Sequence, residues 1–408
     1  MAMTPNRRYN GIMSLMLHEF HHSLGARFSE LNGAEVVNDY GDWLAEHAAL
    51  RQGAGVLDLS HRSRICLTGA DRVRFLHGQM TNDVKKLRAG EGCYAAVVTN
   101  KGKMESDLNI FCLQDELLLD FEPGLAENIS QRLEKFIVAD DVQIADVAPH
   151  YGLLSVQGPK AEEAIQGLGW GERPREPFAS MKISDSTLGE IYLANNSRLF
   201  SFPLPAKRGE GQGAGQNQTT SPRPSPPFRG GEGEKISRGF DLFIPNNSLG
   251  AVADKLIAAA KQIGGRACGW QAFETARIEA GIPRYGMDMD ETNIPLECGI
   301  ESRAIVYNKG CYIGQEVINR IHSLGHVNKE LRGLRLADDL RSLPQRGDKL
   351  FHDGKEIGYV TSPVKSPTIG NIALGYVRRE ANQIGTELIL KAASGESAAK
   401  IVGLPFVK

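Results

Sequence analysis

The pattern of hydrophobic residues changes once along this chain, and the change separates two kinds of structure. Up to about residue 330, strand-like runs and amphipathic helical segments follow each other without a regular βαβ repeat. From Leu331 onward, only short strand-like runs remain, separated by Gly and Pro turns. Irregular mixing of strands and helices is typical of α+β folds, and closely spaced short strands are typical of a small barrel. We therefore predict an α+β body over residues 17–330 and a compact β-barrel over residues 331–408.

Within the body, the spacing of apolar residues indicates the type of most segments. Alternating or continuous apolar runs predict strands at residues 55–60, 64–68, 94–98, 108–113, 116–120 and 239–245. Helical spacing predicts helices at residues 43–52, 127–136, 249–263 and 272–280. Gly69-Ala70-Asp71 is typical of a helix start, so another helix should follow it.

Two segments lack the apolar residues that a packed structure needs. Residues 203–234 are rich in Gly, Pro, Ser and Gln and nearly free of aliphatic side chains. Such a composition cannot repay its ordering entropy, so we predict a disordered insertion within the body. Its closure would cost roughly 2 kcal/mol, which a stable domain can absorb. The first 16 residues are predicted to form a disordered extension.

Composition excludes several classes of protein. The net charge of −2 makes a large nucleic-acid surface improbable, so we expect no stable nucleic acid. No apolar run reaches the roughly 20 residues needed to cross a bilayer, so no membrane contact is expected. The six cysteines contain no CxxC pair, which favours reduced thiols in the cytoplasm and predicts no metal site. The sequence also lacks the GxSxG, HExxH, P-loop and GxGxxG elements of common enzyme classes.

Cys311 has the most unusual surroundings of any cysteine in the chain. Gly310 and Gly314 bracket it, which permits close approach of a ligand. Lys309 is two positions away, and a nearby ammonium favours a thiolate. A lone cysteine is nevertheless more often a small core residue than a nucleophile. On the residues alone, both roles stay open for Cys311.

Other polar residues have a functional and a plain interpretation. Arg277 and Glu279 end a predicted helix and can bind a carboxylate and the donor edge of a pterin-like ring, or form surface salt bridges. Asp107, beside Ser106, can act as a general acid or base, or cap a strand. His61 is expected to be a satisfied structural histidine. The acidic residues Asp288, Asp290 and Glu291 are expected to form a solvated loop.

The residues from Lys309 to Glu316, KGCYIGQE, resemble the signature of the YgfZ family. Its members are folate-binding relatives of the glycine-cleavage T-protein, an aminomethyltransferase. The likeness covers nearly the whole chain apart from the insertion. It continues in residues 46–52, 55–61, 69–84, 140–142, 153–161, 277–286 and 358–377.

The resemblance implies a three-lobed body with a central pocket for tetrahydrofolate or a derivative, followed by the barrel. It places Lys309 and Cys311 in the pocket, with Arg277 and Glu279 at the folate end. Tyr312 and Gln315, within the same signature, are further candidate folate contacts. Cys311, Lys309 and Asp107 are the candidate catalytic residues. The family supports iron–sulfur enzymes, including one that modifies tRNA, so iron–sulfur client enzymes are the expected partners of a monomer.

Two departures from the T-protein pattern bear on this expectation. T-proteins generally carry paired aspartates where this chain has Ser106-Asp107, which leaves one acid. Relatives also carry a Thr-Gly-Glu turn where this chain has Ile236-Ser237-Arg238. The leading hypothesis is thus a folate-binding accessory protein for iron–sulfur enzymes. The alternatives are an aminomethyltransferase that moves a one-carbon unit to tetrahydrofolate, and a non-catalytic scaffold that uses the insertion.

Overall fold

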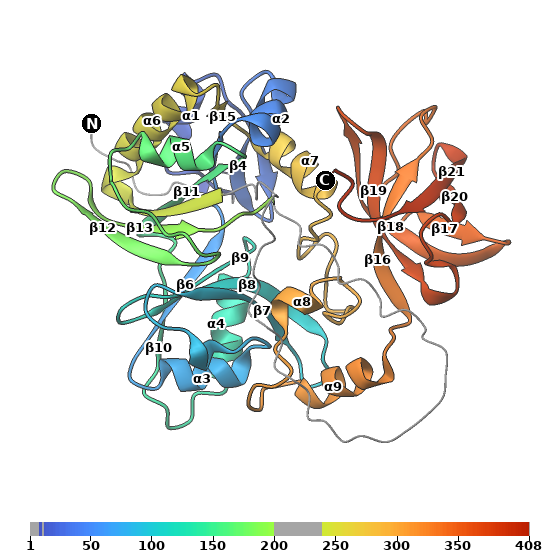
Figure 1. The fold of residues 1–408 in the computed structure, drawn as a ribbon, viewed down its shortest axis with the longest axis horizontal. Helices are drawn as coiled ribbons and strands as arrows, with labels where there is room; N and C mark the ends of the chain where they lie inside the picture. The colour runs from blue at the N-terminus through green and yellow to red at the C-terminus, as the bar shows by residue number, and fades with distance from the viewer. Residues whose placement is uncertain (1–7, 10–11, 200–238, 408) are drawn as a thin grey trace, which may run out of the picture.

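The computed structural model describes residues 8–9, 12–199 and 239–407. They form a body of two main sheets with helices and, beside it, a closed barrel (Figure 1). The predicted α+β body and C-terminal barrel are both confirmed. Most of the predicted extension and insertion lies outside the described residues.

The larger sheet of the body has six strands in the order β12-β13-β14-β11-β5-β15. Its strands are β5 (Gly55–Asp58), β11 (Tyr151–Gln157), β12 (Ser180–Asp185), β13 (Gly189–Asn195), β14 (Gly239–Pro245) and β15 (Arg266–Ala267). Helices α5 (Ala161–Gln166) and α6 (Asn246–Gln262) pack on it. Leu249 of α6 lies so close to Gly152 of β11 that a Cβ there would be 2.4 Å from its Cδ2. A side chain at this position would therefore require Leu249 to move, and glycine allows the helix to pack closely on the sheet.

The second sheet has five strands in the order β10-β6-β9-β8-β7. Its strands are β6 (Ser63–Thr68), β7 (Gly92–Val98), β8 (Met104–Cys112), β9 (Leu117–Phe121) and β10 (Gln143–Asp146). Helices α3 (Arg72–Gln79) and α4 (Ala126–Glu134) accompany it, with the short helix η1 (Val84–Lys86). The spacing of Ile129, Leu133 and Phe136 predicts one apolar face for this helix; Ile129 and Leu133 are buried on α4, whereas Phe136 follows the end of the helix and is exposed.

Residues before the first predicted strand form a third unit. Strands β1 (Arg8–Tyr9), β2 (Ile12–Met13), β3 (Arg27–Leu31) and β4 (Ala34–Asp39) make a four-stranded sheet, with α1 (His18–Ser23) between β2 and β3 in the chain. The next helix, α2 (Trp43–Gln52), packs on α7 (Trp270–Glu279) and on β5 of the six-stranded sheet. Met13 pairs with Ala34, and Leu15 is buried. The prediction that residues 1–16 are disordered is therefore wrong for residues 12–16. Met13 pairs with β4, a contact that the spacing of residues in the sequence does not reveal.

A buried ion-pair chain joins the two main sheets. Arg198, which follows β13, contacts Asp120 of β9 at 2.8 Å and Asp241 of β14 at 2.6 Å. Arg62 contacts the other oxygen of Asp120 at 2.8 Å. Because both carboxylates are fully buried, removing one cation would leave a buried charge without its partner. The chain therefore fixes how the two sheets face each other.

The barrel closes in the order β16-β19-β18-β17-β20-β21. Its strands are β16 (Lys329–Leu336), β17 (Lys349–His352), β18 (Lys355–Ser366), β19 (Gly370–Arg378), β20 (Glu387–Ala392) and β21 (Gly395–Val402), with η2 (Arg379–Ala381) after β19. It packs against α7 of the body through β18 and β19, and the chain reaches it by way of α8 (Glu301–Ala304) and α9 (Gln315–Leu324). Tyr376 of β19 also donates a hydrogen bond to the Cys298 sulfur at 3.2 Å.

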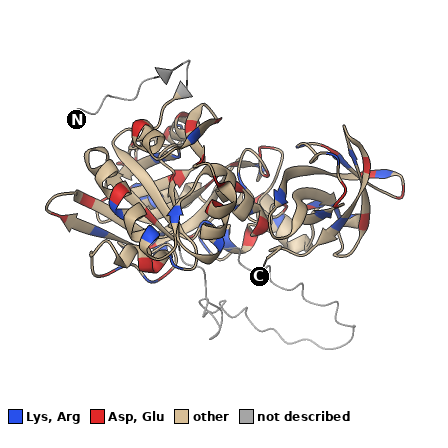
Figure 2. Cartoon of the chain, turned by 90° about the horizontal axis from the view of Figure 1, so that it is seen from above, with Lys and Arg blue, Asp and Glu red and all other residues tan. Residues whose placement is uncertain are grey.

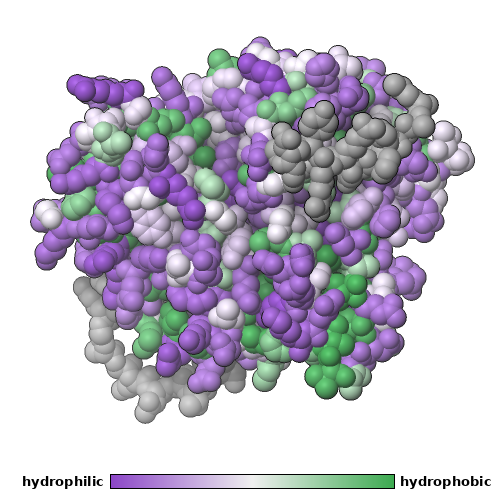
Figure 3. Space-filling view, turned by 180° about the vertical axis from the view of Figure 1, so that it is seen from behind, coloured by the Kyte–Doolittle hydropathy of each residue, from purple (hydrophilic) through white to green (hydrophobic). Residues whose placement is uncertain are grey.

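The surface is mixed in character. Lys and Arg are interspersed with Asp and Glu over both body and barrel (Figure 2). On the face seen from behind, hydrophobic side chains gather only in small groups among hydrophilic ones (Figure 3). In the part of the chain that the structure describes, no helix is long and apolar enough to cross a membrane.

Candidate functional site

Asp107 is a half-buried carboxylate near the middle of strand β8. The Tyr94 hydroxyl, from the neighbouring strand β7, donates a hydrogen bond to its Oδ2 at 2.7 Å. Its other oxygen, Oδ1, is buried and has no hydrogen-bond partner among the described residues. Buried acceptors are nearly always satisfied in folded proteins, so this oxygen is suited to a ligand that donates a hydrogen bond.

The surroundings of Asp107 favour the protonated form of its carboxyl group. Burial, followed by the nearby Glu122 carboxylate, raises the pKa of Asp107 to about 6. The Tyr94 hydrogen bond and the Arg62 and Arg303 guanidinium groups act in the opposite direction and limit the rise. The Arg303 guanidinium also lies 4.8 Å from the centre of the Tyr94 ring. A carboxyl group with such a pKa can both hold and release a proton near neutral pH.

Lys309 fastens the KGCYIGQE segment to the end of helix α3. Its ammonium donates three hydrogen bonds, to the carbonyl oxygens of His77 and Met80 at 2.6 Å each and of Asn82 at 2.8 Å. These bonds use all three of its protons, so none is left for Cys311. Burial lowers the pKa of Lys309 to about 8. In this structure Lys309 has a structural role, because it links its segment to the end of helix α3. Its predicted contact with folate stays a prediction.

Cys311 lies at the protein surface, two residues after Lys309. It is exposed, whereas four of the other cysteines are buried and Cys93 is half-buried. Gly314 then has φ of +84°, and a Cβ there would lie 2.5 Å from the Thr99 oxygen. The turn therefore requires glycine, and helix α9 begins directly after it at Gln315.

The other residues of the segment are divided between two environments. Tyr312 is buried under the Lys309 ammonium, which lies 4.9 Å from the centre of its ring. Its hydroxyl is buried and has no partner among the described residues. Gln315 is half-buried at the start of α9, and its backbone N–H donates to the Tyr312 carbonyl at 3.2 Å. No hydrogen bond or ion pair within the described ranges joins Cys311 to Asp107.

Arg277 joins helix α7 to the barrel. Its guanidinium donates to Asp288 Oδ2 at 2.6 Å and to the Ser362 hydroxyl of β18 at 2.8 Å, and it also pairs with Glu274. Asp288 in turn accepts from the Thr361 hydroxyl at 2.5 Å. The expected solvated loop is thus wrong for Asp288, which is buried because it neutralises Arg277.

Glu279 is a second buried link between body and barrel. It accepts from the Ser366 hydroxyl of β18 at 2.5 Å, and its other oxygen lies 3.0 Å from His47 Nε2. Burial raises the pKa of Glu279, but the His47 and Ser366 hydrogen bonds outweigh burial, and the net pKa is lowered. Arg277 and Glu279 are therefore bound to protein partners, not to each other. Their contact with a folate stays a prediction.

Sequence reasoning missed two features of the site. Tyr94 could have been found from hairpin register, because Asp107 pairs with Ala96 and Tyr94 is its diagonal neighbour on the same face. His61 was expected to be satisfied, and this is wrong among the described residues. Both of its ring nitrogens are buried without a hydrogen-bond partner, and burial lowers its pKa to about 3. Its ring instead packs edge-on against Trp270.

Comparison with known proteins gives one consistent answer. The family described as GCVT N-terminal domain matches residues 17–197 and 235–309. The glycine cleavage T-protein C-terminal barrel domain matches residues 329–408. The aminomethyltransferase of Halalkalibacterium halodurans is 30% identical over 390 residues, which cover 93% of this chain and 96% of that protein. That of Bacillus subtilis is 28% identical, over 96% of this chain and 98% of its own length.

A solved structure shows the same fold. The crystal structure of glycine cleavage system aminomethyltransferase T from Bartonella henselae matches with a TM-score of 0.80 at 22% identity. The match covers 97% of this chain and 98% of that one. With two matching domains and a relative aligned over almost its whole length, the chain belongs to the glycine cleavage T-protein family.

Proposed function

We propose that this protein binds a reduced folate at Asp107 and transfers a one-carbon unit to it, as an aminomethyltransferase does. The observation that carries the proposal is the buried, unpartnered Oδ1 of Asp107. Family membership supports it, because the curated relatives are named aminomethyltransferases over nearly the same length of chain.

The residues around Asp107 fit a reduced pterin ring. Such a ring presents N–H donors along one edge, and Oδ1 is an acceptor without a donor. The Tyr94 hydrogen bond to Oδ2 fixes the plane of the carboxyl group, so the lone pairs of Oδ1 point in a fixed direction. When bound, the folate supplies the nitrogen that takes up the one-carbon unit. Asp107 would orient that nitrogen and carry its proton, and its pKa of about 6 suits both tasks.

A second function is supported by a separate observation. Cys311 is exposed on a segment fixed by three hydrogen bonds from Lys309, although aminomethyl transfer from a lipoyl sulfur needs no cysteine of the protein. A displayed thiol on a rigid support suits transient contact with a sulfur or cluster species. The second candidate is therefore the folate-binding accessory role for iron–sulfur enzymes, in which Cys311 is the chemical residue and such enzymes are the partners.

Two variants separate the two functions. Aminomethyl transfer to tetrahydrofolate should be measured with wild type, Asp107→Asn and Cys311→Ala, and rescue of iron–sulfur enzyme activity should be measured in cells that lack this protein. The proposed transferase loses activity with Asp107→Asn and keeps it with Cys311→Ala. If wild type transfers nothing but rescues the cells, and Cys311→Ala does not, the accessory role is correct and the transferase proposal fails.

A further inference from the structure

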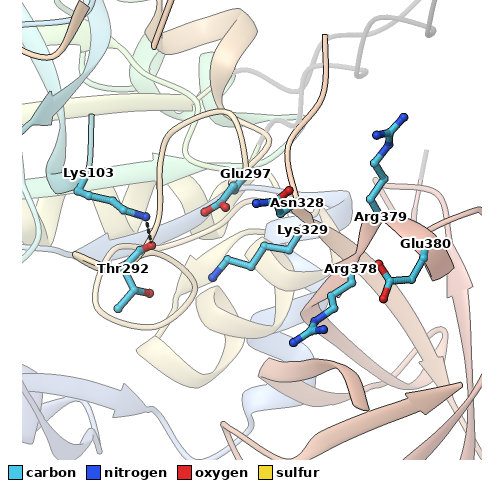
Figure 4. Close-up of a pocket in the computed structure, with 8 residues that line it drawn as sticks. All are labelled: Lys103, Thr292, Glu297, Asn328, Lys329, Arg378, Arg379 and Glu380. Atoms are coloured by element: carbon cyan, nitrogen blue, oxygen red, sulfur yellow. Dashed lines mark hydrogen bonds between the residues drawn. The ribbon is translucent and has the colours of Figure 1, made fainter. Parts of the chain in front are cut away.

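An open, polar surface pocket of about 860 Å³, called the cavity below, lies where the barrel meets the body, apart from the contacts of Asp107 described above (Figure 4). Lys103 reaches it from the hairpin turn that precedes β8. Lys329 lines it at the start of β16, and Arg378 and Arg379 line it where β19 ends, with the Arg379 side chain pointing away from the other three cations. The cavity is therefore built from both parts of the protein, and its volume is in the range of small-molecule sites.

The charges of this cavity are not neutralised by the protein. None of its four cations forms an ion pair with a carboxylate in the described ranges. Lys103 donates to the Thr292 carbonyl at 2.5 Å, and Lys329 donates to the Tyr359 hydroxyl at 3.3 Å. Lys329 also lies 4.8 Å from the centre of the Tyr376 ring, and both arginines are exposed. An anion that enters the pocket would therefore meet cations whose charge no carboxylate of the described residues balances.

Two carboxylates face the same space. Glu297 and Glu380 line the cavity and, among the described residues, have no cationic partner. Figure 4 shows Glu380 on the barrel side, beside the arginines, and Glu297 on the side of the body loop. A ligand that carries only negative charge would be repelled by both. The lining thus favours a ligand with anionic groups at one end and hydroxyl or amino donors elsewhere.

We propose that this cavity binds a nucleotide. Its phosphates would lie against Arg378 and the two lysines, with Arg379 at the rim, because a guanidinium group can bind two phosphate oxygens at once. The ribose hydroxyls and the amino group of the base would donate to Glu297 and Glu380. A bound nucleotide would touch body and barrel together and hold them in one arrangement. The proposal does not depend on folate binding or on the reaction at Asp107.

Calorimetric titration of the full chain without folate tests it, with ATP, AMP and tripolyphosphate as probes at about 150 mM salt. We expect ATP to bind with one-to-one stoichiometry, more tightly than AMP or tripolyphosphate. The double variant Arg378→Gln/Arg379→Gln should weaken ATP binding by about tenfold or more. Arg335→Gln, an exposed arginine of the same barrel outside the cavity, should leave it unchanged.

Three results would overturn the proposal. The first is no binding of ATP, and the second is binding that the double variant leaves intact. The third is tripolyphosphate binding as tightly as ATP, which would show a plain anion site. Because Arg378 and Arg379 are exposed, the double variant should fold, and an unchanged melting temperature checks this. Raised melting temperature with ATP in wild type, absent in the double variant, is the independent readout that binding predicts.

Discussion

Replacing Asp107 with asparagine should make the stability of this protein depend less on pH. The carboxyl has a pKa of about 6 in the folded protein against the usual 3.8, because burial penalises its charged form. Between these two values the folded state binds more protons than the unfolded state. Stability that is fully present below pH 3.8 is therefore lost as pH rises to about 6, and it does not return above that.

The size of the effect follows from the difference between the two pKa values. At roughly 1.4 kcal/mol per pKa unit, it amounts to at most ~3 kcal/mol. Asparagine cannot ionise and keeps an oxygen for the Tyr94 hydroxyl. Any constant cost of its amide group is the same at every pH. As the pH rises from 4 to 7.5, the unfolding free energy of the variant should therefore increase relative to that of wild type by up to this amount.

Urea unfolding of both proteins at these two pH values measures the difference directly. Asp115→Asn serves as the control, because Asp115 is exposed on a turn. The reasoning is refuted if the difference in unfolding free energy between Asp107→Asn and wild type is the same at pH 4 and pH 7.5 within about 0.5 kcal/mol. A change in favour of wild type at the higher pH refutes it as well.

Three further predictions concern Lys309, Arg277 and Cys311. Lys309→Met should cost about 3 kcal/mol or more in urea unfolding, since it leaves three carbonyls without a donor, and Lys309→Arg should not restore it. Arg277→Met should cost about 3–5 kcal/mol and speed proteolysis between body and barrel, because it strands the buried Asp288; equal proteolysis rates would argue against the link. Iodoacetamide should label the native protein once, at Cys311, and Cys311→Ser should abolish the label in mass spectrometry; rapid labelling of a buried cysteine would contradict the structure.

The fold was accessible from the sequence wherever local pattern decides the structure. The predicted helix at residues 249–263 is α6, and the predicted strand at residues 239–245 is β14. Strands paired with distant partners were missed, as for β2 beside β4, because a two-residue strand has no periodicity to detect. Helix α9 was missed because the glycine turn before it hides its start.

The candidate site was only partly accessible for a related reason. Sequence indicated Asp107 as a possible acid, but its pKa depends on Glu122 and Tyr94, which reach it through strand pairing. Lys309 was predicted to assist Cys311, whereas its protons go to carbonyls more than 200 residues earlier in the chain. Such contacts depend on tertiary structure, and spacing along the sequence does not encode them.

Binding of tetrahydrofolate tests the central claim most directly. Anaerobic calorimetric titration should compare wild type with Asp107→Asn and the control Asp115→Asn. The account predicts one site per chain in wild type and in the control, and affinity lowered by about tenfold or more in Asp107→Asn. Absence of binding in wild type, or equal affinity in all three proteins, would contradict a folate site at Asp107.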